Sequence, residues 1–313
     1  MKLPVSIVIP AYNVGPFLDE TLSSVQQQTF CQFEAIIVDD GSTDRTAEIA
    51  QKFMGQDSRF VLLRQPRGGA SAARNQAVNQ ARGEWVAFLD ADDVWLPTKL
   101  AAQIELSKQE PKANFLFTDH FFWDGRSDLG RRYSDDRKFP NGDVGRGLIF
   151  FNLFGPLTVM VRRETLDAAG PFDIDLKLAE DWDCWLRIAD QGLCAKGVRQ
   201  SLARYRRWPG QKSGNAIPMQ EQKVRVLEKA LARPQCGSRR RSYERSLQIA
   251  RGNLELARTR PLLELQPGVV SAAAWRAWRH CPTRMKWLLW YFATLWPNSP
   301  CAGIVYHKIR TKW

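Results

Sequence analysis

The sequence predicts an α/β protein in which a mainly parallel β-sheet is flanked by helices and followed by a helical C-terminal extension. Short apolar, β-branched runs alternate with amphipathic segments between residues 5 and 89, a pattern typical of βαβ units. From Met219 onward the apolar residues follow helical spacing only. The chain has 313 residues, 44% of them hydrophobic, and can bury a sizeable core. We therefore expect an α/β domain over residues 1–215 and a helical extension over residues 216–313.

Four buried strands are expected in the first part of the chain, each followed by a helix. The strands are the apolar runs 5–9, 35–38, 60–63 and 85–89. Pro16 suits the first turn of the first helix, and Thr43 or Asp44 can cap the second. Beyond an irregular stretch, the sequence predicts a strand over 157–161, a helix ending at Gly170 and a helix over 181–191.

The net charge of +12 is concentrated in the C-terminal part of the chain. Residues 196–313 contain 24 Lys and Arg against 5 Asp and Glu, whereas residues 1–195 contain 21 against 28. A uniformly basic nucleic-acid-binding protein would not show this uneven distribution of charge. The basic C-terminal part instead indicates an anionic surface as its partner, either a membrane or a nucleic acid. The six cysteines form no CxxC pair, which argues against a zinc site and indicates reduced thiols in the cytoplasm.

Acidic residues follow two of the expected parallel strands. Asp39 and Asp40 follow the second strand, and Asp90-Ala91-Asp92 follows the fourth. Ligands bind beyond the carboxyl ends of such strands, so these carboxylates should converge at one binding edge. A cation would offset their repulsion, and Asp-x-Asp oxygens suit Mg²⁺ or Mn²⁺. Taken singly, either cluster also fits a turn or a helix cap.

Phosphate-binding loops of the common nucleotide-binding types are absent from the sequence. There is no Gly-Lys-Ser/Thr loop, and no Gly-x-Gly-x-x-Gly follows the first strand. Phosphates would therefore be held mainly by the metal, which favours a diphosphate that departs as a leaving group.

Eight motifs follow one another along the first two thirds of the chain: Val5–Asn13, Val38–Asp44, Ala73–Asn75, Phe88–Asp93, Thr118-Asp119, Val161–Arg163, Gly170–Asp173 and Ala179–Asp181. In this order and spacing they resemble the motifs of the family 2 glycosyltransferases of the GT-A fold. The resemblance covers roughly residues 1–210, about two thirds of the chain. It implies the GT-A Rossmann-like fold and an inverting transfer of sugar from a nucleotide-diphosphate-sugar.

The resemblance also implies roles for individual residues. Those that would bind the nucleotide sugar are Pro10, Ala11, Tyr12, Asn13, Asp39, Asp40, Gly41, Arg74, Asp90 and Ala91. Asp40 would accept a hydrogen bond from the base, and Asp92 would bind the metal that bridges the diphosphate. Glu180 and Asp181 would be catalytic, with Asp181 as the general base.

Asp181 also fits the role of base on chemical grounds. A sugar hydroxyl is a weak nucleophile until a positioned carboxylate takes its proton during attack. The alternative is that Glu180 and Asp181 simply begin a helix, because acidic side chains favour helix N-termini.

Trp208 departs from the family's pattern. It lies in the segment 204–210, at a position where relatives often have a histidine. If that histidine contacts metal or diphosphate in the relatives, this chain must do without it. Arg206 or Arg207 could contact the diphosphate instead.

Tryptophan alternates with Lys and Arg at the end of the chain. The tryptophans are Trp275, Trp278, Trp287, Trp290, Trp296 and Trp313. The apolar run 287–296 is too short to span a bilayer, which needs about 20 residues. The composition suits an interfacial helix on anionic lipid, and the alternative is a helical cap packed on the catalytic domain.

These features together predict a metal-dependent, hexosyltransferase-like inverting glycosyltransferase of cell-envelope polysaccharide synthesis. Its donor would be a UDP-sugar and its acceptor a glycan or polyprenyl-linked sugar. We expect the enzyme to be cytoplasmic, peripheral on the inner face of the membrane, and without a nucleic-acid partner. A nucleotidyltransferase is an alternative, although Pro10–Asn13 stands where its glycine-rich loop would be. A nucleic-acid-binding protein using Arg239–Arg241 is another, but no recognition signature accompanies these residues.

Overall fold

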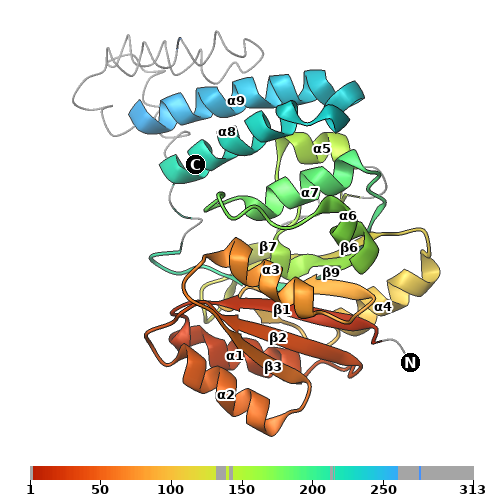
Figure 1. The fold of residues 1–313 in the computed structure, drawn as a ribbon, viewed down its shortest axis with the longest axis vertical. Helices are drawn as coiled ribbons and strands as arrows, with labels where there is room; N and C mark the ends of the chain where they lie inside the picture. Colours follow the sequence, from red (N-terminus) through yellow and green to blue (C-terminus); the bar gives the residue numbers. More distant parts are fainter. Residues whose placement is uncertain are drawn as a thin grey trace. The chain divides into compact units, whose positions relative to one another are not determined.

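Figure 1 shows the computed structural model of the chain, which describes residues 3–131, 139–140, 144–211, 214, 216–259 and 275. The chain forms two compact units, Met1–Gln211 and Lys212–Trp313. The first contains a nine-stranded sheet with helices, and the described part of the second is helical.

The elements of the first unit alternate between strands and helices over much of its length. The strands are β1 (Val5–Ala11), β2 (Phe33–Asp39), β3 (Phe60–Arg64), β4 (Trp85–Phe88), β5 (Val94–Trp95), β6 (Phe115–Trp123), β7 (Asp128–Arg131), β8 (Val159–Arg162) and β9 (Ala195–Arg206). The helices are α1 (Gly15–Gln26), α2 (Thr46–Gln56), α3 (Ala70–Gln80), α4 (Lys99–Gln109), α5 (Gly145–Phe150), the 3-10 helix η1 (Pro156–Thr158), α6 (Arg163–Ala169) and α7 (Glu180–Asp190).

The sheet has the order β3-β2-β1-β4-β8-β6-β9-β5, and β7 pairs with β6. The first four of these strands run parallel, as their apolar sequences predict. β8 is antiparallel to both of its neighbours, β4 and β6. β6 and β9 are again parallel, and β5 is antiparallel to β9. The sheet is therefore mixed, and its carboxyl edge at β1, β2 and β4 is the one that carries the predicted site.

Several element boundaries differ from those expected: β1 and β2, for example, extend beyond the apolar runs 5–9 and 35–38. The cap position of α2 is Arg45, not Thr43 or Asp44, although Asp44 Oδ1 accepts a hydrogen bond from the Thr46 amide at 3.0 Å. The strand expected from residue 157 begins at Val159, because the three preceding residues form η1.

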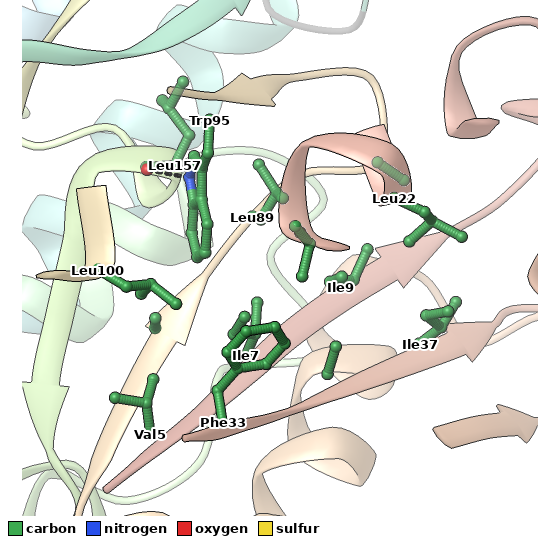
Figure 2. Packing of buried hydrophobic residues seen from close by; sticks show 14 of the residues in the cluster. Val5, Ile7, Ile9, Leu22, Phe33, Ile37, Leu89, Trp95, Leu100 and Leu157 are labelled. Carbon is green, nitrogen blue, oxygen red and sulfur yellow. Dashed lines mark hydrogen bonds between the residues drawn. The ribbon is translucent and has the colours of Figure 1, made fainter. Parts of the chain in front are cut away.

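A hydrophobic cluster of the first unit lies between the parallel strands and the helix that follows β1. Figure 2 shows Ile7 and Ile9 of β1 beside Ile37 of β2 and Leu22 of α1, all of them completely buried. Trp95 closes one side of this cluster. Its indole nitrogen donates to the carbonyl of Leu157 at 2.7 Å, which satisfies a buried polar group. α1 and α2 lie on one face of the sheet and α3 on the other (Figure 1).

The described part of the second unit contains α8 (Ala216–Ala232), the 3-10 helix η3 (Pro234–Arg239) and α9 (Arg240–Thr259). Two ion pairs join the long helices, Arg251–Glu228 at 2.8 Å and Arg258–Glu221 at 2.7 Å. No described helix is both long and apolar enough to cross a membrane. Apart from Trp275, which is exposed, the tryptophan-rich segment of the sequence lies outside the described residues.

Candidate active site

Hydrogen bonds join the loops that follow β1 and β2. The backbone nitrogen of Asn13 donates to Ser42 Oγ at 3.0 Å, and the Thr43 amide donates to Asn13 Oδ1 at 2.9 Å. Asn13 has a φ of +49°, in the left-handed region that few residues other than glycine adopt. Asp39 is buried, and its Oδ1 accepts the Ser42 amide at 3.0 Å. Asn13 and Asp39 therefore shape the loops, and their contact with a nucleotide stays a prediction.

Asp40 anchors the loop that leads into α3. Its Oδ1 accepts hydrogen bonds from Gln65 Nε2 at 2.6 Å and from the Gly68 amide at 2.7 Å. Its Oδ2 accepts the Gly69 amide at 2.8 Å. The side chain is 3% exposed. A hydrogen bond from a base to Asp40 remains a prediction, and it would be made beside these existing donors.

The end of β1 presents an aromatic ring next to a cation. Ala11 is buried, whereas Pro10 and Tyr12 are half-buried. The Arg67 guanidinium lies 4.3 Å from the centroid of the Tyr12 ring. Gly41 has a φ of +74°, and a Cβ there would come within 3.0 Å of the Arg67 amide. A half-buried aromatic ring and a guanidinium at this edge are groups that can contact a base and its phosphates.

Arg74 joins the end of β4 to the start of α7. Its Nη2 donates to Asp90 Oδ1 and its Nη1 to Glu180 Oε1, both at 2.6 Å. The guanidinium is almost completely buried. Burial alone would lower the pKa of Arg74, but the carboxylates of Asp90 and Glu180 raise that pKa above its ordinary value. This cation brings together the two acidic motifs that lie far apart in the sequence.

Asp92 lies beside an indole. Trp208 Nε1 donates to Asp92 Oδ2 at 2.9 Å, and Oδ1 has no hydrogen bond from another residue in the described part of the chain. Burial and the neighbouring Asp90 raise the pKa of Asp92. Asp93 is buried, accepts the Arg206 amide at 2.8 Å, and has a pKa raised well above its ordinary value by burial and Asp92. Neither Asp92 nor Asp93 caps a helix, since α4 begins later in the chain.

Arg206 is engaged within the protein. Its Nη2 donates to Glu20 at 2.6 Å and its Nε to the Asp92 carbonyl at 2.7 Å. The guanidinium lies 4.2 Å from the ring centroid of Trp123 and 4.9 Å from that of Phe17. Because this cation is buried and paired, we assign it a structural role in place of the diphosphate contact considered from the sequence.

Asp181 is placed in the first turn of α7, which begins at Glu180. Asn152 Nδ2 donates to Asp181 Oδ2 at 2.7 Å. Burial and Glu180 raise the pKa of Asp181 to about 6, against the lowering effects of Asn152 and Arg74. Ala179, just before the helix, has a φ of +60°, a strained value that tends to occur at functional sites. A carboxyl group with a pKa close to the operating pH is suited to general-base catalysis.

Two asparagines of the candidate site have contacts that the sequence did not predict. Asn75 exchanges two hydrogen bonds with the backbone of Phe172, at 2.7 and 2.8 Å. It thereby ties the motif 73–75 to the motif 170–173. Asn152 lies in no recognisable motif, so only the fold shows its contact with Asp181.

The carboxylates fit a metal that is shared with substrate. In the described ranges, no group of three or more His, Cys, Asp or Glu side chains could hold an ion by itself. Mg²⁺ is usually held by one or two carboxylates together with substrate phosphates. Asp92, one oxygen of which accepts no hydrogen bond from any other described residue, and Asp90, with a partly exposed side chain, are the residues that would hold it.

The sequence has clear relatives. A family model described as Glycosyl transferase family 2 matches residues 6–163. The putative teichuronic acid biosynthesis glycosyltransferase TuaG of Bacillus subtilis is 34% identical over 207 residues, 64% of this chain and 78% of the relative. The Escherichia coli enzyme named UDP-Glc:alpha-D-GlcNAc-diphosphoundecaprenol beta-1,3-glucosyltransferase WfaP is 32% identical over 212 residues, 67% of this chain and 80% of the relative.

Solved structures share the architecture. Staphylococcus aureus TarS 1-349, in complex with UDP-GlcNAc, superposes with a TM-score of 0.67 at 21% identity, over 94% of this chain and 86% of that chain. The mannosyltransferase PcManGT from Pyrobaculum calidifontis, in complex with GDP-Man and Mn²⁺, gives a TM-score of 0.57 at 20% identity, over 94% and 88%. These likenesses confirm the GT-A fold predicted from the motifs.

Proposed function

Because the chain belongs to glycosyl transferase family 2, we propose that it moves a sugar from a UDP-sugar to a hydroxyl group of a polyprenyl-diphosphate-linked or other envelope glycan. WfaP is named for a lipid-diphosphate acceptor and TuaG for teichuronic acid synthesis. TarS was crystallised with UDP-GlcNAc. The family also favours glycosyl transfer over the nucleotidyltransferase and nucleic-acid-binding alternatives.

The contact that most supports this proposal is the double ion pair of Arg74. One partner, Asp90, belongs to the Asp90-Ala91-Asp92 triplet that follows β4. The other, Glu180, immediately precedes the proposed base Asp181. This buried cation supports the proposal, because it would hold a carboxylate of the proposed donor side and one of the proposed acceptor side in fixed positions.

The residues present can perform an inverting displacement. Asp181 takes the proton of the acceptor hydroxyl as that oxygen bonds to the anomeric carbon. The bond from the anomeric carbon to the diphosphate breaks, and its electron pair leaves with the diphosphate. Attack from the side opposite the leaving group inverts the configuration. A Mg²⁺ or Mn²⁺ ion at Asp92 and Asp90 would neutralise negative charge on the leaving diphosphate.

Asp92→Ala tests the metal assignment. We expect the variant to stay folded and to lose the enhancement that Mn²⁺ gives to UDP binding, since Asp92 supplies the oxygen for the ion. Calorimetric titrations with several nucleoside diphosphates, with and without Mn²⁺, measure this and identify the base. Asp19→Ala, which removes an exposed carboxylate paired with Lys52, is the matched control. Undiminished metal-dependent affinity in Asp92→Ala would show that the ion binds elsewhere.

Peripheral membrane binding remains part of the proposal and depends on the chain after Val269. Each basic residue near an anionic surface contributes about 1 kcal/mol, within a Debye length of the surface. We therefore expect anionic vesicles to sediment the full chain at low salt and to release much of it at high salt. A chain ending at Gly268 should stay in the supernatant. If both forms stay in solution, the tryptophans do not anchor the enzyme. The proposed location on the cytoplasmic face of the membrane would then no longer be supported.

A further inference from the structure

We propose that Trp208 is a positioning residue, whose indole N–H holds Asp92 in the orientation that binds the divalent cation. The inference rests on the proposed function, because it concerns the metal expected at Asp92. It assigns a role in this chain to the residue that departs from the family's pattern.

The indole of Trp208 donates to one of the two oxygens of the Asp92 carboxylate. Trp208 Nε1 lies 2.9 Å from Asp92 Oδ2. The other oxygen, Oδ1, receives no hydrogen bond from another residue that the structure describes. Indole nitrogen is a donor and has no lone pair for a metal. Trp208 therefore cannot be a ligand itself, and it leaves Oδ1 of Asp92 available to the cation.

The indole is itself held in place. Its ring packs against Phe17, with centroids 5.2 Å apart, in a tilted arrangement. Gly210 also lies near the ring, since an added Cβ there would come within 3.2 Å of Trp208 Cζ3. The packing on Phe17 restricts the ring and so helps to fix the direction from which the N–H reaches Asp92.

The backbone of the same segment is tied to the Asp92-Asp93 pair. Arg206 donates its amide to Asp93 and its Nε to the Asp92 carbonyl, at 2.8 and 2.7 Å. Trp208 then adds the side-chain contact to Asp92. Losing that contact would remove one of the interactions that hold the Asp92 carboxylate beside Asp90, whose negative charge repels it. Partners of metal ligands act in this way, by fixing the direction of the ligand oxygen.

The variant Trp208→Phe separates the effect of the hydrogen bond from the effect of the ring packing. Phenylalanine can keep the packing on Phe17 but lacks the N–H. We expect Mn²⁺ affinity in the presence of UDP, measured from the electron paramagnetic resonance signal of free Mn²⁺, to fall about 10- to 100-fold. UDP affinity in the presence of a chelator should be unchanged. Trp85→Phe, at the opposite end of β4, is the matched control and should leave both affinities at the wild-type values.

A second variant guards against a general loss of structure. Phe17→Leu keeps the indole but removes its aromatic support, and it should produce a smaller loss of Mn²⁺ affinity of the same kind. The proposal is overturned if Trp208→Phe binds Mn²⁺ like the wild type. It is equally overturned if Mn²⁺ affinity and metal-free UDP affinity fall together, because Trp208 would then shape the nucleotide pocket. If the wild-type protein itself shows no Mn²⁺-dependent UDP binding, the proposed function fails, and this inference fails with it.

Discussion

Replacing Asp181 with asparagine is expected to reduce glycosyl transfer by about 10²- to 10⁴-fold, the usual contribution of a general base. Asparagine keeps the size of the side chain but cannot accept the proton of the acceptor hydroxyl. Binding of the UDP-sugar should remain almost unchanged, since Asp181 acts on the acceptor. Initial rates of UDP release with saturating acceptor, together with calorimetry of the donor, separate the two effects. Full transfer activity in this variant would remove Asp181 from the mechanism.

The pH dependence provides an independent check on the same residue. The pKa of Asp181 is raised to about 6, so its basic form is lost as the pH falls through that value. The wild-type rate should therefore decline on the acid side of pH 6, and the remaining rate of Asp181→Asn should not show this limb. Asn152→Ala removes a donor that stabilises the carboxylate, so its acid limb should move to higher pH. An unmoved limb would show that another group controls the profile.

Replacing Arg74 with methionine is expected to cost about 3–5 kcal/mol of the free energy of unfolding, the range for removing one partner of a buried ion pair. Two carboxylates lose their cation, and both Asp90 and Glu180 have side chains less than a third exposed. Asp181 also loses a nearby positive charge that lowers its pKa. Transfer should fall along with stability, because both sides of the site depend on the same guanidinium.

Urea unfolding monitored by circular dichroism measures the loss at Arg74. Lys52→Met is the control, because the Lys52–Asp19 pair is about half exposed and such pairs contribute little. If Arg74→Met unfolds at the same urea concentration as Lys52→Met, the two acidic motifs are not held together by this cation.

The sequence predicted the parallel half of the sheet better than the rest. β1, β2 and β4 are short buried runs, and an apolar run is itself a strand signal. β9 was not predicted, because it combines buried and exposed residues, including Arg199 and Gln200, without an apolar run. Its pairing with β6 depends on residues that are distant in the sequence, which local patterns do not reveal.

The same distinction applies to the site. The motifs identified the acidic residues of the site and Arg74, but not the contacts that other side chains make with these acidic residues. Asn152 and Asp181 are 29 residues apart, Trp208 and Asp92 are 116 apart, and Arg206 and Glu20 are 186 apart. A motif can suggest a role for a single residue, but it does not show the hydrogen bonds that this residue makes within the protein. Asp40, expected to bind the base, is already the anchor of the Gly68-Gly69 loop.

The configuration of the transferred sugar tests the central claim most directly. The full chain would be incubated with Mn²⁺, a UDP-sugar selected by the binding titrations, and a polyprenyl-diphosphate-linked sugar as acceptor. The anomeric proton coupling of the product, measured by NMR, is then compared with that of the donor. A single displacement with Asp181 as base predicts a glycosidic bond of inverted configuration. A product of retained configuration, or no sugar on the acceptor with any UDP-sugar that binds, would contradict the account.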